Sequence, residues 1–123
     1  DDGPQDELNR MPKTGLNFGY PYCHAQGIVD PDVKKADACK DVTKPVALMG
    51  PHAAVMGIKF YTGDMYPAEY KNSMFITRKG SWNRTKPSGG LVNFVPVNAD
   101  GTAGRTLPCT LLFQFTIIES VER

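Results

Sequence analysis

The stretch "GIKFYTGDMYPAEYKNSMFITRKG" (residues 57–80) contains two short runs of β-forming residues separated by a turn-rich segment. Aromatic and β-branched residues bounded by glycine, proline and asparagine are typical of strands. Two similar runs follow at residues 91–97 and 109–118, and Asp100-Gly101 between them is a common tight-turn pair. Four sequential strands with short connections predict an antiparallel meander, the unit of a β-propeller blade.

The segment before this meander, residues 1–56, shows little periodicity. Its six prolines exclude a long helix. We therefore expect an all-β chain, with a long Pro/Gly-rich connection at residues 1–56 and a blade at residues 57–118. A single meander cannot bury both of its faces, so further propeller segments or a homo-oligomer are expected to cover it. A self-contained sandwich needs about seven strands, and the sequence offers fewer.

Composition excludes several classes of partner. The 123 residues carry a net charge of +1 and a pI near 7.9, which gives no electrostatic reason to expect a nucleic acid or an anionic membrane. No apolar run reaches the roughly 20 residues of a membrane helix. The opening "DDGPQDELNR" is polar and is not a signal peptide, although a mature secreted protein would also lack one.

The pair Cys23-His24 has three interpretations: a metal site, a catalytic dyad or a structural corner. No second Cys/His cluster stands at ligand spacing, and sequence neighbours rarely face each other as a dyad must. A Cys23–Cys39 disulfide would close a loop of about 15 residues and stabilise the fold by roughly 3 kcal/mol. We predict this disulfide, which favours an oxidising compartment. Cys109 then remains as a small buried apolar residue.

Three motifs carry a family resemblance: "GLNFGYPYCHAQGIVDP" (15–31), "GPHAAVMGIKFYTGDMYPAEYKNSMFI" (50–76) and "KGSWNR" (79–84). In order and spacing the chain resembles the soluble glucose/sorbosone dehydrogenases over roughly residues 5–98. Those proteins are six-bladed β-propellers that bind pyrroloquinoline quinone (PQQ) and calcium and oxidise aldose sugars. The resemblance implies a periplasmic or secreted segment of a quinoprotein dehydrogenase. It assigns no catalytic residue, because the family's proton-abstracting histidine lies upstream of the matched part.

The resemblance also implies ligand sites. Main-chain carbonyls of Gly19, Tyr20 and Pro21 would ligate calcium, whose preference for hard oxygen ligands agrees with this role. The implied cofactor-binding side chains are those of His52, Lys79, Trp82 and Arg84, with the lysine pairing with a quinone carboxylate.

Plainer interpretations stand beside these. His52 could be an ordinary turn residue, Lys79 a solvated lysine at a strand end, and Trp82 a packing residue. The chain as a whole could be a non-catalytic β module that self-assembles through exposed blade faces, or a truncated reading frame without activity.

Overall fold

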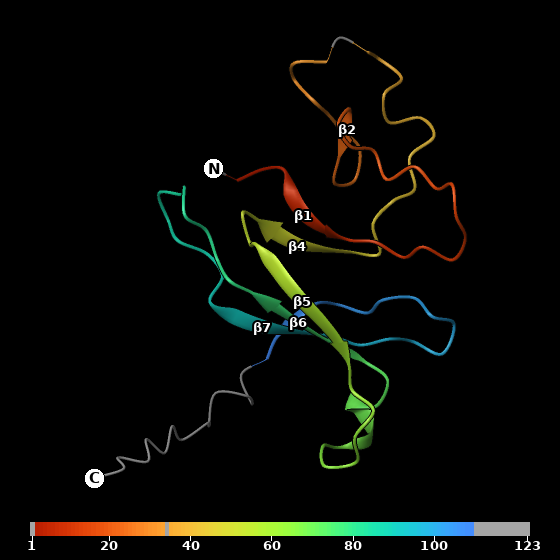
Figure 1. The fold of residues 1–123 in the computed structure, drawn as a ribbon, viewed down its shortest axis with the longest axis vertical. Helices are drawn as coiled ribbons and strands as arrows, with labels where there is room; N and C mark the ends of the chain where they lie inside the picture. The colour runs from red at the N-terminus through yellow and green to blue at the C-terminus, as the bar shows by residue number, and fades with distance from the viewer. Residues whose placement is uncertain (1, 34, 110–123) are drawn as a thin grey trace.

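The computed structural model describes residues 2–33 and 35–109 of the chain, and this part is essentially all-β (Figure 1). It forms three separate antiparallel sheets: a β1–β4 pair, a β2–β3 pair and a four-stranded sheet in the order β5-β6-β7-β8. The strands are β1 (Gln5–Leu8), β2 (Cys23–His24), β3 (Ile28–Val29), β4 (Ala47–Pro51), β5 (Val55–Phe60), β6 (Met74–Arg78), β7 (Leu91–Val95) and β8 (Leu107–Pro108). A single 3-10 turn, η1 (Ala68–Tyr70), precedes β6.

The four-stranded sheet confirms the predicted antiparallel meander. Its register pairs Ile58 with Ile76 and Ile76 with Asn93, so alternate residues of β5, β6 and β7 share a face. The fourth strand is β8, which precedes the run predicted at 109–118; residues 110–123 lie outside the described part. The sheets of the described residues are open, so they form a blade-like unit and no closed propeller.

The segment 1–56 contains more structure than the predicted connection. Strand β1 pairs with β4 across about 40 residues of chain, and β2 pairs with β3 as a small hairpin. Strand β1 was not predicted because "QDEL" has no apolar alternation. The carboxylates of this strand accept hydrogen bonds from backbone N–H groups elsewhere in the chain. A hydrophobic pattern does not reveal such contacts.

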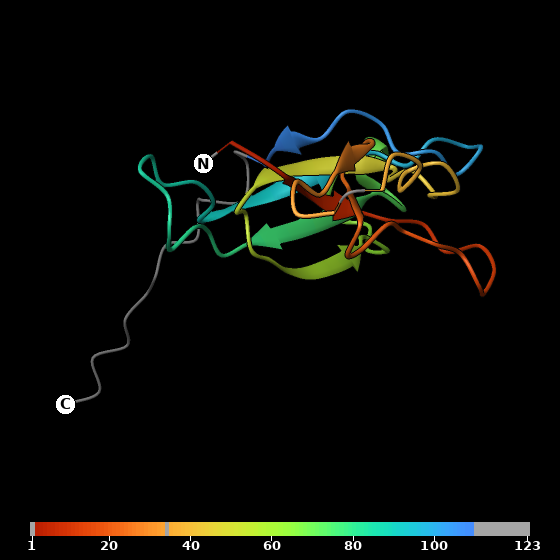
Figure 2. The same ribbon diagram turned by 90° about the horizontal axis from the view of Figure 1, so that it is seen from above.

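The core lies between the two larger sheets. Met49 of β4 packs with Met74, Ile76 and Val95 of the four-stranded sheet, and all four are buried. Seen from above, β1 and β4 lie on one face of that sheet (Figure 2). The opposite face carries aromatic rings, with the cross-strand pair Phe75 and Phe94 at a centroid distance of 5.5 Å.

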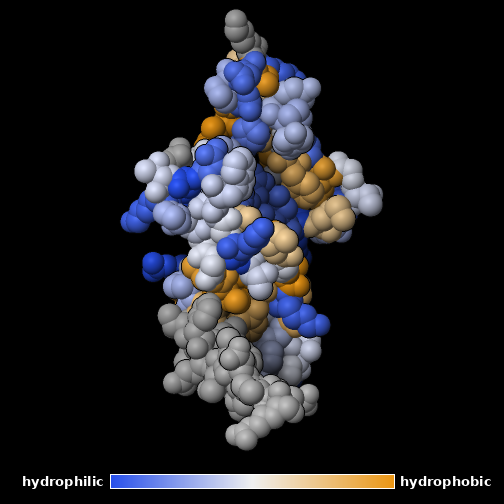
Figure 3. Space-filling view, turned by 60° about the vertical axis from the view of Figure 1, so that its left-hand side comes forward, coloured by the Kyte–Doolittle hydropathy of each residue, from blue (hydrophilic) through white to orange (hydrophobic). Residues whose placement is uncertain are grey.

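Apolar side chains also reach the surface. Every residue of the edge strand β5 is exposed, including Met56 at 70% and Ile58 at 52%. Figure 3 shows apolar residues in patches between hydrophilic ones on one side of the molecule. Folding of the described residues therefore leaves a substantial part of one strand without apolar cover.

Candidate functional site

Three carboxylates of the N-terminal segment, among the described residues, each bind a different part of the chain. Asp2 pairs with the Arg84 guanidinium, Asp6 accepts hydrogen bonds from the turn after β4, and Glu7 accepts one from the main chain at Ala25. These three partners lie in the three motifs that the sequence analysis singled out. The segment before and within β1 therefore assembles the candidate site.

The turn between β4 and β5 is held by Asp6. Its Oδ2 accepts hydrogen bonds from the N–H groups of Ala53 at 2.8 Å and Ala54 at 3.0 Å. His52 and Ala54 both adopt positive φ, at 52° and 48°, a conformation that is unfavourable for residues with a Cβ. The two charge-assisted hydrogen bonds offset this cost. They also fix the backbone position from which the exposed His52 side chain extends.

The loop after β6 lies against the same turn. The N–H groups of Lys79 and Gly80 donate to the carbonyls of Ala54 and Ala53, each at 3.0 Å. A Cβ on Gly89 would lie 2.1 Å from the Gly80 Cα, so the loop can close only with glycine there. The sequence "RKGSWNRTKPSGG" thus forms a tight loop at the end of the sheet where β5 begins, close to the N-terminus (Figure 1).

Four basic side chains gather at this end of the sheet, and we call His52, Arg78, Lys79 and Arg84 the basic end. The Arg84 side chain is only 15% exposed and pairs with Asp2, whose side chain is 87% exposed, at 2.5 Å. Within the described part of the chain, the Nε atoms of Arg78 and Arg84 are buried without a hydrogen-bond partner. Both Nε–H groups are therefore buried donors without a protein partner among these residues.

Arg78 is the member of the basic end that the sequence analysis did not select. Burial lowers the pKa of Arg78, and the nearby negative charge of Asp6 acts in the opposite direction. Its Nη1 donates to the Asn93 side chain at 3.4 Å. A cation on the core-facing side of an otherwise apolar strand, in register with Ile76 and Met74, was the available signal.

The structure thus brings together the backbone segments that carry the side chains predicted to bind a cofactor. His52 and Lys79 are exposed on neighbouring backbone segments, and Arg84 is anchored by the N-terminal segment. Trp82 in the same loop is 94% exposed, which contradicts its interpretation as a packing residue within the described part of the chain.

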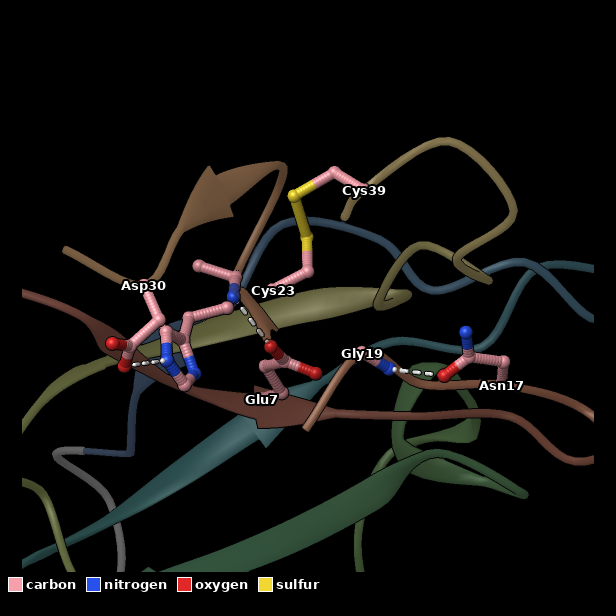
Figure 4. The surroundings of a disulfide bond; sticks show 8 residues. Glu7, Asn17, Gly19, Cys23, Asp30 and Cys39 are labelled. Carbon is pink, nitrogen blue, oxygen red and sulfur yellow. Dashed lines mark hydrogen bonds and ion pairs between the residues drawn. A yellow bond between two sulfur atoms is a disulfide. The ribbon is translucent and has the colours of Figure 1, made fainter. Parts of the chain in front are cut away.

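The predicted calcium segment forms a tight corner at residues 17–23 (Figure 4). Gly19 has a φ of 102°, its N–H donates to the Asn17 side chain, and its carbonyl accepts from the N–H groups of Tyr22 and Cys23 at 2.9 and 3.0 Å. Two hydrogen bonds use both lone pairs of that carbonyl. This leaves the carbonyls of Tyr20 and Pro21 as the better candidates for a cation ligand.

A disulfide joins Cys23 to Cys39, as the sequence predicted (Figure 4). His24 binds Asp30 instead, with Nε2 and Oδ2 separated by 2.8 Å, and this hydrogen bond lowers the pKa of Asp30. The neighbours Cys23 and His24 therefore form no catalytic dyad. Among the described residues, no cluster of three or more His, Cys, Asp or Glu side chains could hold a metal ion.

A cavity of about 330 Å³ lies between this corner and β1. Its lining mixes polar and aromatic side chains, among them Asp6, Glu7, Phe18, Tyr20 and His24. Because Asp6 also holds the turn at His52, a single strand separates this cavity from the basic end.

Comparison with known proteins assigns the family. A family model described as TrAA12-like matches residues 2–111. The chain belongs to the TrAA12-like family. An uncharacterized protein of Borreliella burgdorferi is 30% identical to it over 116 residues, which cover 94% of this chain and 30% of that protein.

Two solved structures of the Trichoderma reesei carbohydrate-active enzyme family AA12, one an iodide and one a calcium structure, share the fold of this TrAA12-like chain. Each has a TM-score of 0.70 and 22% sequence identity, and the match covers 89% of this chain and 32% of the fungal one. The chain therefore spans less than a third of the proteins that it matches.

This assignment corrects the sequence analysis. The resemblance to soluble glucose/sorbosone dehydrogenases was wrong, because the family matched over nearly the whole chain is TrAA12-like. The quoted motifs encode local backbone features, namely the Gly19 corner, the turn at Ala53 and the Gly80–Gly89 contact. Such features specify how a corner or loop closes, and they do not distinguish proteins that share them.

Among the described residues, no helix has the length and apolar character needed to cross a membrane.

Proposed function

We propose that this chain is part of a PQQ-dependent oxidoreductase and that its basic end binds the carboxylates of the quinone. The TrAA12-like family is related to PQQ-dependent AA12 oxidoreductases, which makes a quinone-linked function plausible. The observation that carries the proposal for this chain is the gathering of two arginines, one lysine and one histidine around the turn after β4.

The chemistry of these donors fits the cofactor. PQQ is a planar tricarboxylate, and guanidinium groups bind carboxylates through two parallel hydrogen bonds. Arg84 is already oriented toward a carboxylate, that of Asp2, through its Nη2. In this proposal Arg84 and Lys79 bind carboxylates and His52 hydrogen-bonds a ring oxygen. The bound quinone would supply the electron acceptor for substrate oxidation.

The finer parts of the proposal concern substrate, calcium and compartment. The structural neighbours belong to a carbohydrate-active family, which supports a sugar or other polyhydroxylated substrate. One neighbour is a calcium structure, and in this chain the carbonyls of Tyr20 and Pro21 are the proposed ligands. A disulfide agrees with a periplasmic or secreted protein. Because the chain spans under a third of its relatives, the remaining polypeptide would complete the active site.

The test is equilibrium dialysis of PQQ against the chain, run with calcium and then with chelator. Trp82, the only tryptophan and 94% exposed beside the basic end, gives a second readout through its fluorescence. Arg84→Ala should weaken binding at least tenfold. Asp2→Asn should strengthen it, because it releases the Arg84 guanidinium from a competing carboxylate.

Lys59→Ala is the matched control, since it removes a positive charge at the far end of β5 and should leave binding unchanged. Absence of saturable binding, or equal effects of the Arg84 and Lys59 variants, would refute the proposed site. Binding that is equal with calcium and with chelator would refute only the calcium part.

A further inference from the structure

The loop between β5 and β6 closes the end of the four-stranded sheet that lies away from the basic end. The basic end lies where β5 begins, and the six residues of that strand, at about 3.3 Å each, place the loop roughly 20 Å from it. Figure 1 shows the loop and η1 projecting from the sheet on the side away from the N-terminus. None of the loop residues belongs to the proposed quinone site.

Five aromatic side chains form a continuous cluster at this loop. The ring centroid of Tyr66 lies 5.2 Å from that of Tyr61 and 5.9 Å from that of Tyr70. Tyr70 in turn contacts Phe75 and Phe94 of the sheet, at centroid distances of 6.0 and 4.8 Å. These are the separations of favourable offset or edge-to-face ring pairs. The cluster therefore gives the loop a packed aromatic floor.

A cavity of about 330 Å³ opens beside this cluster. Four of its lining residues are aromatic, and none is Leu, Ile, Val or Met; the four are Phe60, Tyr61, Tyr66 and Phe75. The core face of the same sheet is different, since Ile76 and Val95 pack there with two methionines. Aliphatic side chains dominate protein cores. An aromatic lining with tyrosine hydroxyls is instead suited to a ligand that is both apolar and polar.

The loop that forms one wall of the cavity is held in place by its own contacts. The Lys71 ammonium donates to the carbonyls of Thr62 and Gly63 at 2.8 and 3.2 Å. The N–H of Tyr66 donates to the Tyr61 hydroxyl at 2.9 Å. A Cβ on Gly63 would lie 2.9 Å from the Tyr61 ring, so only glycine allows the loop to approach this ring so closely. A ligand would therefore meet a wall that is already ordered, which lowers the entropic cost of binding.

The polar groups at the cavity narrow the class of ligand. In the described part of the chain, the O–H of Tyr61 has no acceptor and the Thr62 hydroxyl has no partner, so both can bond a ligand. The positive charge of Lys59 in the lining disfavours a cation. The volume lies at the lower end of the range of about 300–1,000 Å³ for small-molecule pockets.

A pyranose ring matches these features, because it has a face of C–H groups and a rim of hydroxyl groups. We propose that this cavity binds a pyranose unit of a carbohydrate. The C–H face lies on the ring of Tyr66, which is 37% exposed, and the hydroxyl groups bond to Tyr61 and Thr62. This carbohydrate site is separate from the basic end and does not rest on quinone binding there.

The test is an NMR titration of the chain with cellotriose, followed through its backbone amide and aromatic ring signals. The ring substituents of the β-linked glucose units are equatorial, so the faces of each ring expose C–H groups. Sorbitol at the same concentration of hydroxyl groups is the matched ligand control, because it has no ring to stack. Cellotriose should give saturable shifts at Gly63, Tyr66 and Phe75, and sorbitol should give none.

Variants then separate stacking from hydrogen bonding. Tyr66→Ala should weaken cellotriose binding about fivefold, whereas Tyr66→Phe keeps the ring and should stay within about twofold of wild type. Thr62→Val removes a hydroxyl at similar volume and should weaken binding about threefold. Tyr22→Ala is the matched control, because Tyr22 is 50% exposed and does not line this cavity. It should leave binding unchanged.

Absence of saturable shifts, shifts centred outside the cavity, or an equal response to sorbitol would overturn the proposal. Equal losses in Tyr66→Ala and Tyr22→Ala would do the same. The wild-type shifts decide the location of the site even where Tyr66→Ala disturbs the loop. The titration contains no PQQ, so a failure of quinone binding at the basic end does not alter its outcome.

Discussion

Replacing Asp6 by alanine should destabilise the chain far more than an ordinary surface substitution. Its carboxylate accepts two backbone hydrogen bonds, at 2.8 and 3.0 Å, from the turn that contains His52 and Ala54. A hydrogen bond to a charged group contributes about 1.5–3 kcal/mol, and Asp6 is only partly buried, so the lower value applies to each bond. We expect Asp6→Ala to lower the free energy of unfolding by about 3 kcal/mol, measured by urea unfolding followed by circular dichroism.

Two further variants test this expected loss of about 3 kcal/mol. Asp6→Asn keeps an acceptor oxygen without its charge and should cost about 1 kcal/mol. Asp64→Ala removes a shorter contact, 2.5 Å to Lys71, but the Asp64 side chain is 93% exposed. Exposed ion pairs contribute less than about 1 kcal/mol. If Asp6→Ala and Asp64→Ala destabilise the chain equally, the Asp6 carboxylate does not hold the turn and the reasoning fails.

Three further predictions follow from the fold. Cys39→Ser should lower the free energy of unfolding by about 3 kcal/mol through loss of the bridge to Cys23; thiol titration of the unfolded, unreduced wild type should find one thiol, and three would exclude the bridge. The depressed pKa of Asp30, caused first by its hydrogen bond with His24, gives a stabilisation that is present above the ordinary value of 3.8 and disappears as pH falls through the lower folded pKa. The urea midpoint of wild type should fall in that window relative to Asp30→Asn, and parallel curves would contradict the assignment. Ile76→Ala should cost about 3–4 kcal/mol, because Ile76 is fully buried; a loss below about 1 kcal/mol in urea unfolding would show that the core lies elsewhere.

The central strands could be predicted because the residue types within each strand already favour β structure. In β6 and β7, branched and aromatic residues alternate between two covered faces, and Phe75 and Phe94 form a cross-strand pair. Antiparallel order also implies that the turn before β5 and the loop after β6 meet at one end. The gathering of His52 and Lys79 therefore follows from the predicted meander.

Strand β1 and its carboxylates could not be predicted in the same way. Asp2 and Asp6 bind partners 82 and 47 residues away, and no periodicity encodes such pairings. Arg78 was missed although its register with Ile76 and Met74 was a signal, because its partial burial and the nearby charge of Asp6 depend on residues far away in sequence. The family was misassigned for a related reason: motifs that fix a corner or a loop report local geometry, and the family is defined over residues 2–111.

The three anchors of the N-terminal segment also set an order of events during folding. Asp2, Asp6 and Glu7 are made before their partners, which follow 82, 47 and 18 positions later. Contacts between distant residues form slowly because the chain must first close long loops. During synthesis, the carboxylate of Asp2 would therefore remain without its partner until the loop at Arg84 has emerged. The basic end would therefore form after the β1–β4 pair, whose residues are all made before Arg84.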